Sequence, residues 1–266
     1  MKKICLREDL IISKLVFGTD KLIKVIGRKN REKLLFGCLD FGITHFDTAP
    51  LYGFGMSECH LRSVLAASPE TTITSKIGLY PPGRPSKCPL QIYSRKLLGK
   101  IYPKISTPLV NFSVDRARLS IEKSRKNLGR DHLDLLLIHD PNLEVFDTDE
   151  WLGFIAELKN SGLVRSVGVD GAIDHIADFL EANPNLFDVI QCRDSLAIKP
   201  EALAQKFNRD PDITFGYIAD ALIGRPINKP LTAFREGLLR FENSAVIATT
   251  TSYEHLAELC FITNDH

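Results

Sequence analysis

The chain has 266 residues, of which 44% are hydrophobic and 25% are charged, so it can bury a large core and is not a disordered protein. Its formal net charge is +1, which gives no overall indication of a nucleic-acid or membrane partner. No apolar run reaches transmembrane length, and residues 1–4 lack the apolar core of a signal peptide. We therefore expect no nucleic-acid partner, no membrane span and a cytoplasmic location.

The cysteines support the same expectation. They are scattered and form no CxxC pair, so we interpret them as reduced thiols rather than as a metal site or a disulfide framework. They are Cys5, Cys38, Cys59, Cys88, Cys192 and Cys260.

In chain order, weak alternation over residues 4–12 first predicts a small hairpin. Strands and helices then alternate along the chain. The predicted strands are 14–19, 44–48, 71–78, 133–139, 164–169, 188–192, 213–219 and 245–249. The predicted helices are 31–41, 57–67, 114–128, 149–160, 172–182, 200–206, 230–241 and 254–262. Residues 79–111, which hold six prolines, are expected to be irregular.

Eight βα units in about 250 residues predict a (β/α)8 TIM barrel, and no break in composition divides residues 1–266 into more than one domain. A doubly wound sheet is the competing architecture. It usually has fewer strands, and no GxGxxG follows a predicted strand here.

The stretch 44–58, THFDTAPLYGFGMSE, joins a predicted strand to a predicted helix. Asp47 leaves the end of the strand, and Tyr52 lies in the Pro/Gly loop that follows. Ser57 is expected to N-cap the helix, and Glu58 suits the positive end of its dipole. Taken alone, the stretch is equally compatible with a structural loop that holds a buried aromatic ring.

In a parallel barrel the carboxyl ends of all strands open onto one face, and that face carries the chemistry. Alone, Lys76 is compatible with a solvated lysine and His139 with a core histidine, but together they accompany an acid and a tyrosine on consecutive strands. The residues at or after these ends are Gly18, Thr19, Asp47, Tyr52, Lys76, His139, Asp170, Gly171 and Gln191.

This set suits proton transfer to or from an oxygen atom. The unperturbed pKa of tyrosine is about 10, and a neighbouring lysine cation is expected to lower the pKa of Tyr52. Asp47 is the expected counter-ion of Lys76, and His139 can orient a carbonyl oxygen by hydrogen bonding. Because no side chain supplies hydride, a nicotinamide cofactor would be needed to reduce a ketone or aldehyde.

The sequence resembles the aldo-keto reductase family from about residue 16 to residue 259. The resemblance is carried, in order, by FDTAPLYGFGMSE, ITSKIG, LGRDHLDLLLIHDP and LKNSGLVRSVGVD, and the first of these is most similar to the aldose 1-dehydrogenase-like branch. It implies a catalytic tetrad of Asp47, Tyr52, Lys76 and His139. It also implies NAD(P)H bound across the opening of the barrel without a Rossmann fold. The cofactor-binding residues implied are Gly18, Thr19, Asp47, Asp170, Gln191, Leu222, Gly224, Arg225, Thr250, Thr251 and Ser252.

The sequence departs from the family pattern in two places. The family usually has Ser–Asn after the fifth strand, on the nicotinamide carboxamide, where this chain has Asp170–Gly171; a carboxylate accepts from an amide NH₂ but cannot donate to its oxygen. Near the NADP 2′-phosphate the family often has basic residues, where this chain has Thr249–Ser252 and Ala257. We therefore expect no strong preference for NADP over NAD.

The segment 79–111 is expected to border the pocket and is basic, with no acid among its residues. One interpretation is a solvated loop; the other is that it attracts an anionic sugar or carbonyl substrate. Its basic residues are Arg84, Lys87, Arg95, Lys96, Lys100 and Lys104.

The sequence thus predicts an NAD(P)-dependent oxidoreductase of carbohydrate or carbonyl metabolism that acts on an aldehyde, ketone or aldose. The alternative is a non-catalytic module that senses cofactor or binds a partner on the same barrel, since a fold alone does not fix a function.

Overall fold

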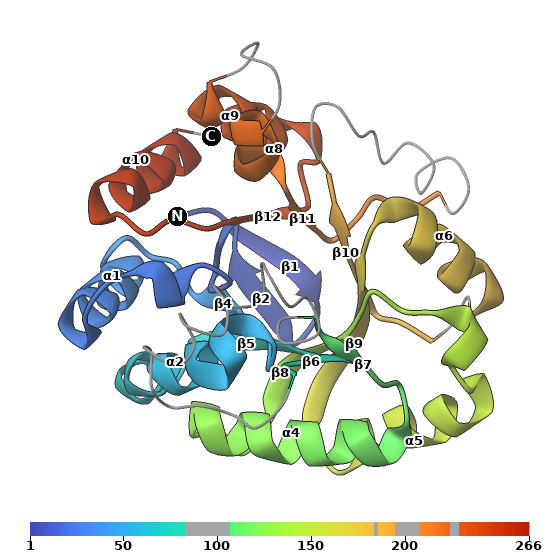
Figure 1. Ribbon diagram of the computed structural model, residues 1–266. Helices are drawn as coiled ribbons and strands as arrows, with labels where there is room; N and C mark the ends of the chain where they lie inside the picture. Colours follow the sequence, from blue (N-terminus) through green and yellow to red (C-terminus); the bar gives the residue numbers. More distant parts are fainter. Residues whose placement is uncertain (83–106, 184–185, 195–207, 224–228, 266) are drawn as a thin grey trace.

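The computed structural model describes residues 1–82, 107–183, 186–194, 208–223 and 229–265, and eight of their strands form a closed parallel barrel (Figure 1). The sheet closes where β12 pairs with β3, so the (β/α)8 prediction is confirmed and the doubly wound alternative is wrong. Every strand starts within one residue of its predicted position. The strands are β3 (Leu15–Gly18), β4 (His45–Asp47), β5 (Thr72–Ile77), β8 (Leu133–His139), β9 (Val164–Gly171), β10 (Val189–Arg193), β11 (Ile213–Phe215) and β12 (Ala245–Ala248).

Helices surround the barrel and bury one face each against it (Figure 1). In α4, Ser113 accepts a hydrogen bond from the backbone of Arg116 at the start, and Gly129 ends the helix at φ 69°, a left-handed conformation that glycine adopts without strain. The described helices are α1 (Arg28–Asp40), α2 (Met56–Ala67), α4 (Val114–Leu128), α5 (Thr148–Asn160), α6 (Ile173–Ala182), α8 (Tyr217–Ile223), α9 (Pro230–Arg240) and α10 (Tyr253–Asn264).

The predicted N-terminal hairpin is present and closes one end of the barrel. Strands β1 (Lys3–Arg7) and β2 (Leu10–Ser13) pair antiparallel. Their inward side chains form one apolar cluster with Val189, Ile213 and Ala245, the first residues of three barrel strands. The hairpin therefore covers the amino ends of the strands and leaves the carboxyl ends for the site.

Two local predictions are wrong. The strand predicted to continue to residue 219 ends at Phe215, because Gly216 takes a φ of +115° and α8 begins at the next residue. Ser57 does not cap α2: the N-cap is Gly55, and the Ser57 hydroxyl lies inside the helix and donates to the carbonyl of Thr19 at 3.0 Å. Glu58 does lie in the first turn, as predicted.

The segment predicted to be irregular starts and ends in a short ribbon. Leu79–Tyr80 (β6) pairs antiparallel with Leu109–Val110 (β7). Residues 83–106, with all six basic residues of this segment, and the helix predicted at 200–206 lie outside the described part of the chain.

Within the described ranges, every helix is too short or too polar to cross a lipid bilayer.

A buried histidine near the start of β4 makes a prediction about acid stability. The ring nitrogens of His45 lie 2.7 Å from the hydroxyls of Thr72 and Thr74, and burial lowers the pKa of His45 to about 3. Below pH 6.5 the unfolded chain takes up a proton that the folded imidazole excludes. Stability should therefore fall on the order of 2 kcal/mol between pH 6.5 and 4.5 through this group.

Urea unfolding at pH 7 and pH 4.5 measures this loss. His45→Gln should lose less stability on acidification than the wild type, each compared with its own value at pH 7. The exposed His255→Gln serves as the control and should behave as the wild type does. An equal loss in wild type and His45→Gln would contradict the assignment.

Candidate active site

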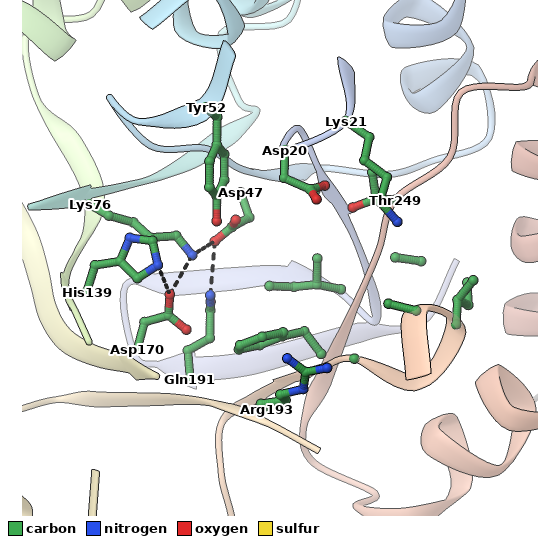
Figure 2. A pocket seen from close by; sticks show the side chains of 17 residues that line it. Asp20, Lys21, Asp47, Tyr52, Lys76, His139, Asp170, Gln191, Arg193 and Thr249 are labelled. Atoms are coloured by element: carbon green, nitrogen blue, oxygen red, sulfur yellow. Dashed lines mark hydrogen bonds and ion pairs between the residues drawn. The ribbon is translucent and has the colours of Figure 1, made fainter. Parts of the chain in front are cut away.

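A cavity of about 300 Å³ opens at the carboxyl ends of the barrel strands. Figure 2 shows Tyr52, Lys76, His139 and Asp170 gathered on one side of it, with Lys21, Arg193 and Thr249 farther away. The lining residues are Gly18, Asp20, Lys21, Asp47, Tyr52, Lys76, His139, Asp170, Gln191, Arg193, Phe215, Gly216, Ile218, Ala219, Ile247, Ala248 and Thr249. The structure thus brings together all four residues that the resemblance implies for catalysis.

Three buried charged side chains, those of Lys76, Asp47 and Asp170, lie together on this side of the cavity. The ammonium of Lys76 lies 2.8 Å from Asp47 Oδ2, which confirms the expected ion pair, and 2.9 Å from Asp170 Oδ2. Gln191 Nε2 also donates to Asp47 Oδ2, at 3.1 Å. These contacts follow from the barrel register, since Asp170 lies opposite His139 on one neighbouring strand and opposite Gln191 on the other.

Tyr52 reaches the cavity from the loop after β4. It begins a short 3₁₀ turn, Tyr52–Gly55, in which Gly53, Phe54 and Gly55 all have positive φ values of 56–88°. Because Phe54 is not glycine, this left-handed conformation is uncommon and needs support from its surroundings. The Tyr52 ring packs edge-on against His139, at 6.4 Å between ring centroids, and the Lys76 ammonium lies 5.7 Å from the Tyr52 ring centroid.

The surroundings set the protonation of these groups. Burial raises the pKa of Asp47 to about 6, with the Lys76 cation opposing that shift. Burial also raises the pKa of Tyr52 above its ordinary value; Lys76 opposes this shift, while Asp47 and Asp170 add to it. Lys76 therefore lowers the pKa of Tyr52 as expected, but the net pKa is raised, because the site is buried and two carboxylates share the one cation.

His139 ends β8 and lies beside both Tyr52 and Asp170. Its Nε2 is 3.6 Å from Asp170 Oδ2, and its buried Nδ1 has no hydrogen-bond partner among the described residues. Burial lowers the pKa of His139, which favours the neutral imidazole. A neutral imidazole can donate a hydrogen bond to a carbonyl oxygen without carrying a charge into the cavity.

Some of the residues expected to bind the cofactor lie at this cavity, some lie at a second cavity, and the rest lie at neither or outside the described residues. Gly18, Asp47, Asp170 and Gln191 line the cavity, and Thr19 lies next to it, with its hydroxyl donating to the carbonyl of Asp47 at 3.0 Å.

Thr250 is buried, while Thr251 and Ser252 line a second cavity of about 440 Å³ between α1 and α10. Leu222 is exposed on α8 and is absent from the lining of the first cavity, and Gly224 and Arg225 lie outside the described residues.

The sequence reasoning missed several lining residues. Arg193 and Phe215 end β10 and β11, so the rule that strand ends carry the site would have found them had it been applied to all eight strands. Asp20 and Lys21 follow Thr19 in the loop after β3. Arg193 is paired with Asp220 of α8 across the edge of the cavity.

The chain is similar in sequence to curated proteins of other organisms. The chain is 32% identical over 183 residues to "Uncharacterized oxidoreductase YcsN" of Bacillus subtilis, which covers 68% of this chain and 57% of the relative. It is 30% identical over 156 residues to "D-threo-aldose 1-dehydrogenase" of Pseudomonas sp., covering 57% of this chain and 45% of the relative. The chain thus spans about half the length of the curated relatives that it matches.

Solved structures show the same fold. The glycerol dehydrogenase AKR11B4 from Gluconobacter oxydans superposes with a TM-score of 0.75 at 19% identity, over 98% of this chain and 89% of the other. The holo form of the aldo-keto reductase AKR11C1 from Bacillus halodurans gives 0.75 at 19% identity, over 98% and 90%. The sequence also matches the profile of the Aldo/keto reductase family over residues 14–215. Since this match covers more than half of the chain, the chain belongs to the Aldo/keto reductase family.

Proposed function

We propose that this protein is an NAD(P)H-dependent oxidoreductase that transfers hydride between a nicotinamide and a carbonyl or alcohol substrate. The observation that carries the proposal is the position of Tyr52 beside the buried Lys76–Asp47 ion pair and His139 in one cavity. In this proposal Tyr52 gives a proton to the substrate oxygen or takes one from it, His139 orients that oxygen, and Lys76 with Asp47 supports the phenol. When bound, the cofactor supplies the hydride, which no side chain can provide.

The cavity has groups that fit a nicotinamide. Asp170 Oδ1 and Gln191 Oε1 are buried acceptors without a hydrogen-bond partner among the described residues, and they suit the two N–H groups of a carboxamide. Phe215 provides an aromatic side chain in the same lining. Gly18 lies close against β12, since a Cβ there would lie 2.6 Å from the Thr249 hydroxyl and 2.8 Å from Ile247. We propose that these residues hold the nicotinamide end of the cofactor.

For the substrate we propose a small aldehyde, ketone or aldose. The names of two relatives, "D-threo-aldose 1-dehydrogenase" and "NADH-specific methylglyoxal reductase" of Escherichia coli, are consistent with this class, although the second is only 28% identical over 160 residues, which cover 45% of that protein. A role in carbohydrate metabolism rests on the same comparison.

The anionic substrate stays a hypothesis that rests on residues 83–106, because the described lining is balanced in charge. Its cations are Lys21, Lys76 and Arg193, and its acids are Asp20, Asp47 and Asp170. The cytoplasmic location and the single-domain organisation likewise stay predictions from the sequence.

A non-catalytic cofactor-binding module is the second candidate, and Asp170 is the observation that favours it. Its carboxylate lies where we propose that the carboxamide binds, and it is a second partner, besides Asp47, for the ammonium of Lys76. Titration with NADH and NADPH, followed by initial rates on a panel of aldehydes and aldoses, separates the two candidates. Turnover that Tyr52→Phe abolishes supports the oxidoreductase; cofactor binding without turnover supports the module.

We predict that NADP is not strongly preferred over NAD. In the first turn of α10, the Ser252 hydroxyl accepts from the backbone N–H of His255 at 3.3 Å and lies 2.6 Å from Glu254 Oε2. A carboxylate at this helix N-terminus disfavours a second anion there, although Lys24 and Lys33 line the same cavity. The kcat/KM values for NADP and NAD should differ by less than about a hundredfold.

The matched variants are Glu254→Gln and Glu258→Gln, one turn apart on α10. Glu254→Gln should raise kcat/KM for NADP about two- to fivefold without changing that for NAD, whereas Glu258→Gln should change neither. A hundredfold preference for NADP in the wild type would place the phosphate contact elsewhere.

A further inference from the structure

The buried charges beside Tyr52 do not balance. Lys76 has two carboxylate partners, Asp47 at 2.8 Å and Asp170 at 2.9 Å, and the side chains of all three residues are only 2–4% exposed. One ammonium and two carboxylates leave the cluster with one uncompensated negative charge when both acids are ionised. A neutral residue at position 170 would leave a neutral ion pair instead.

Besides these three charged residues, His139 and Asp20 are titratable groups near Tyr52. Lys76 comes from β5, Asp47 from β4, Asp170 from β9 and His139 from β8, while Asp20 follows β3 (Figure 2). His139 adds no positive charge in its neutral form. Asp47, Asp170 and Asp20 each raise the pKa of Tyr52, and Lys76 lowers that pKa.

We propose that Asp170 is a positioning residue for the proton transfer: by sharing the Lys76 ammonium with Asp47, it keeps Tyr52 in its phenol form and biases the site toward carbonyl reduction. This inference rests on the proposed function. In reduction the hydride adds to the carbonyl carbon, the carbonyl π electrons move to oxygen, and the Tyr52 proton completes the alcohol. The phenolate left behind is then reprotonated from solvent. Alcohol oxidation needs the phenolate at the outset, and the Asp170 charge disfavours that form.

The direct test titrates Tyr52 itself without turnover. Phenolate absorbance is followed against pH in the whole protein and in Tyr52→Phe, and the difference reports Tyr52. Asp170→Asn removes the charge at nearly constant volume and should lower the Tyr52 midpoint by about one pH unit or more, a tenfold change in the phenol-to-phenolate ratio. Asp170→Glu keeps the charge and should keep the high midpoint.

Kinetics give the second readout. The alkaline limb of the reduction rate should move to lower pH in Asp170→Asn, and the ratio of kcat for oxidation to kcat for reduction, each at saturating substrate and neutral pH, should rise about tenfold. Asp170→Ser repeats the test if Asp170→Asn folds poorly, and the exposed Glu236→Gln on α9 controls for loss of a surface carboxylate.

The outcomes separate this inference from the proposed function. An unchanged Tyr52 midpoint in folded Asp170→Asn and Asp170→Ser overturns the role of Asp170, even if the enzyme is active. A shifted midpoint in a protein that turns over no carbonyl substrate supports the charge coupling and overturns the direction bias along with the proposed function.

Discussion

Tyr52→Phe is expected to lower kcat for carbonyl reduction by about 10²–10⁴-fold, the usual contribution of a positioned acid–base group. The change removes the hydroxyl and keeps the ring, so the edge-on contact with His139 and the shape of the cavity should persist. Because the phenol is proposed to act on the substrate oxygen and not on the cofactor, the affinity for NAD(P)H should change little. Steady-state rates and calorimetric titration of the cofactor measure the two effects separately.

Tyr80→Phe is the matched control for this variant. Tyr80 is buried on β6 and does not line the cavity, so loss of its hydroxyl should leave kcat within about threefold of the wild type, the effect expected for a change remote from the reacting atoms. Equal rates in Tyr52→Phe and wild type would remove Tyr52 from the chemistry, and equal losses in both tyrosine variants would indicate a general effect of the hydroxyls on folding.

The barrel and the site face could be predicted because both follow from short-range rules. The apolar run Leu135–Ile138 before His139 is typical of a strand buried on both sides, and glycines such as Gly129 and Gly162 end the helices before the next strands. Once eight such units form a closed parallel barrel, their carboxyl ends must meet, which brings Asp47, Lys76 and His139 together.

The double role of Asp170 could not be predicted in this way. The sequence places Asp170 after an apolar stretch, and the resemblance directed attention to a carboxamide contact. Only the register, with Asp170 opposite His139 and Gln191, puts a second carboxylate on Lys76. The net direction of the Tyr52 pKa depends on that contact and on burial, and neither is visible from the order of the residues.

The backbone geometry of two turns could not be predicted from the sequence either. Ser57 follows a Gly-rich loop and is a common N-cap residue, but the positive φ of Gly55 starts α2 earlier and turns the Ser57 hydroxyl to the carbonyl of Thr19. At Gly216 the apolar run ITFGYIA suits a long strand, and the positive φ of the glycine breaks it. A glycine permits such a conformation without requiring it, so the sequence alone leaves both outcomes open.

Lys76→Met is expected to destabilise the protein by about 3–5 kcal/mol at pH 7 and to abolish turnover, because it leaves two buried carboxylates without their cation. Loss of the cation should also make stability strongly dependent on pH. The pKa of Asp47 is already raised to about 6 in the folded protein, and without Lys76 it should rise further above its value in the unfolded chain.

The sign of that dependence identifies the cause. A group with a raised pKa binds its proton more tightly in the folded state, so the stability that Lys76→Met loses relative to the wild type should be smallest near pH 4–5 and should grow as the pH rises toward 7. Urea unfolding across this range measures it. The exposed Lys126→Met, which breaks only the surface pair with Glu122, should stay within about 0.5 kcal/mol of the wild type at every pH.

The double variant Lys76→Met/Asp170→Asn completes the test. Removing one of the two stranded charges should recover part of the stability lost at pH 7 and flatten the dependence on pH, because only Asp47 then has to be protonated or left uncompensated. If the loss came instead from the shape of the methionine side chain, the second substitution would restore nothing, and the loss would be the same at pH 5 and pH 7. Recovery at pH 7 with little effect at pH 5 would assign the stability of this site to its three buried charges.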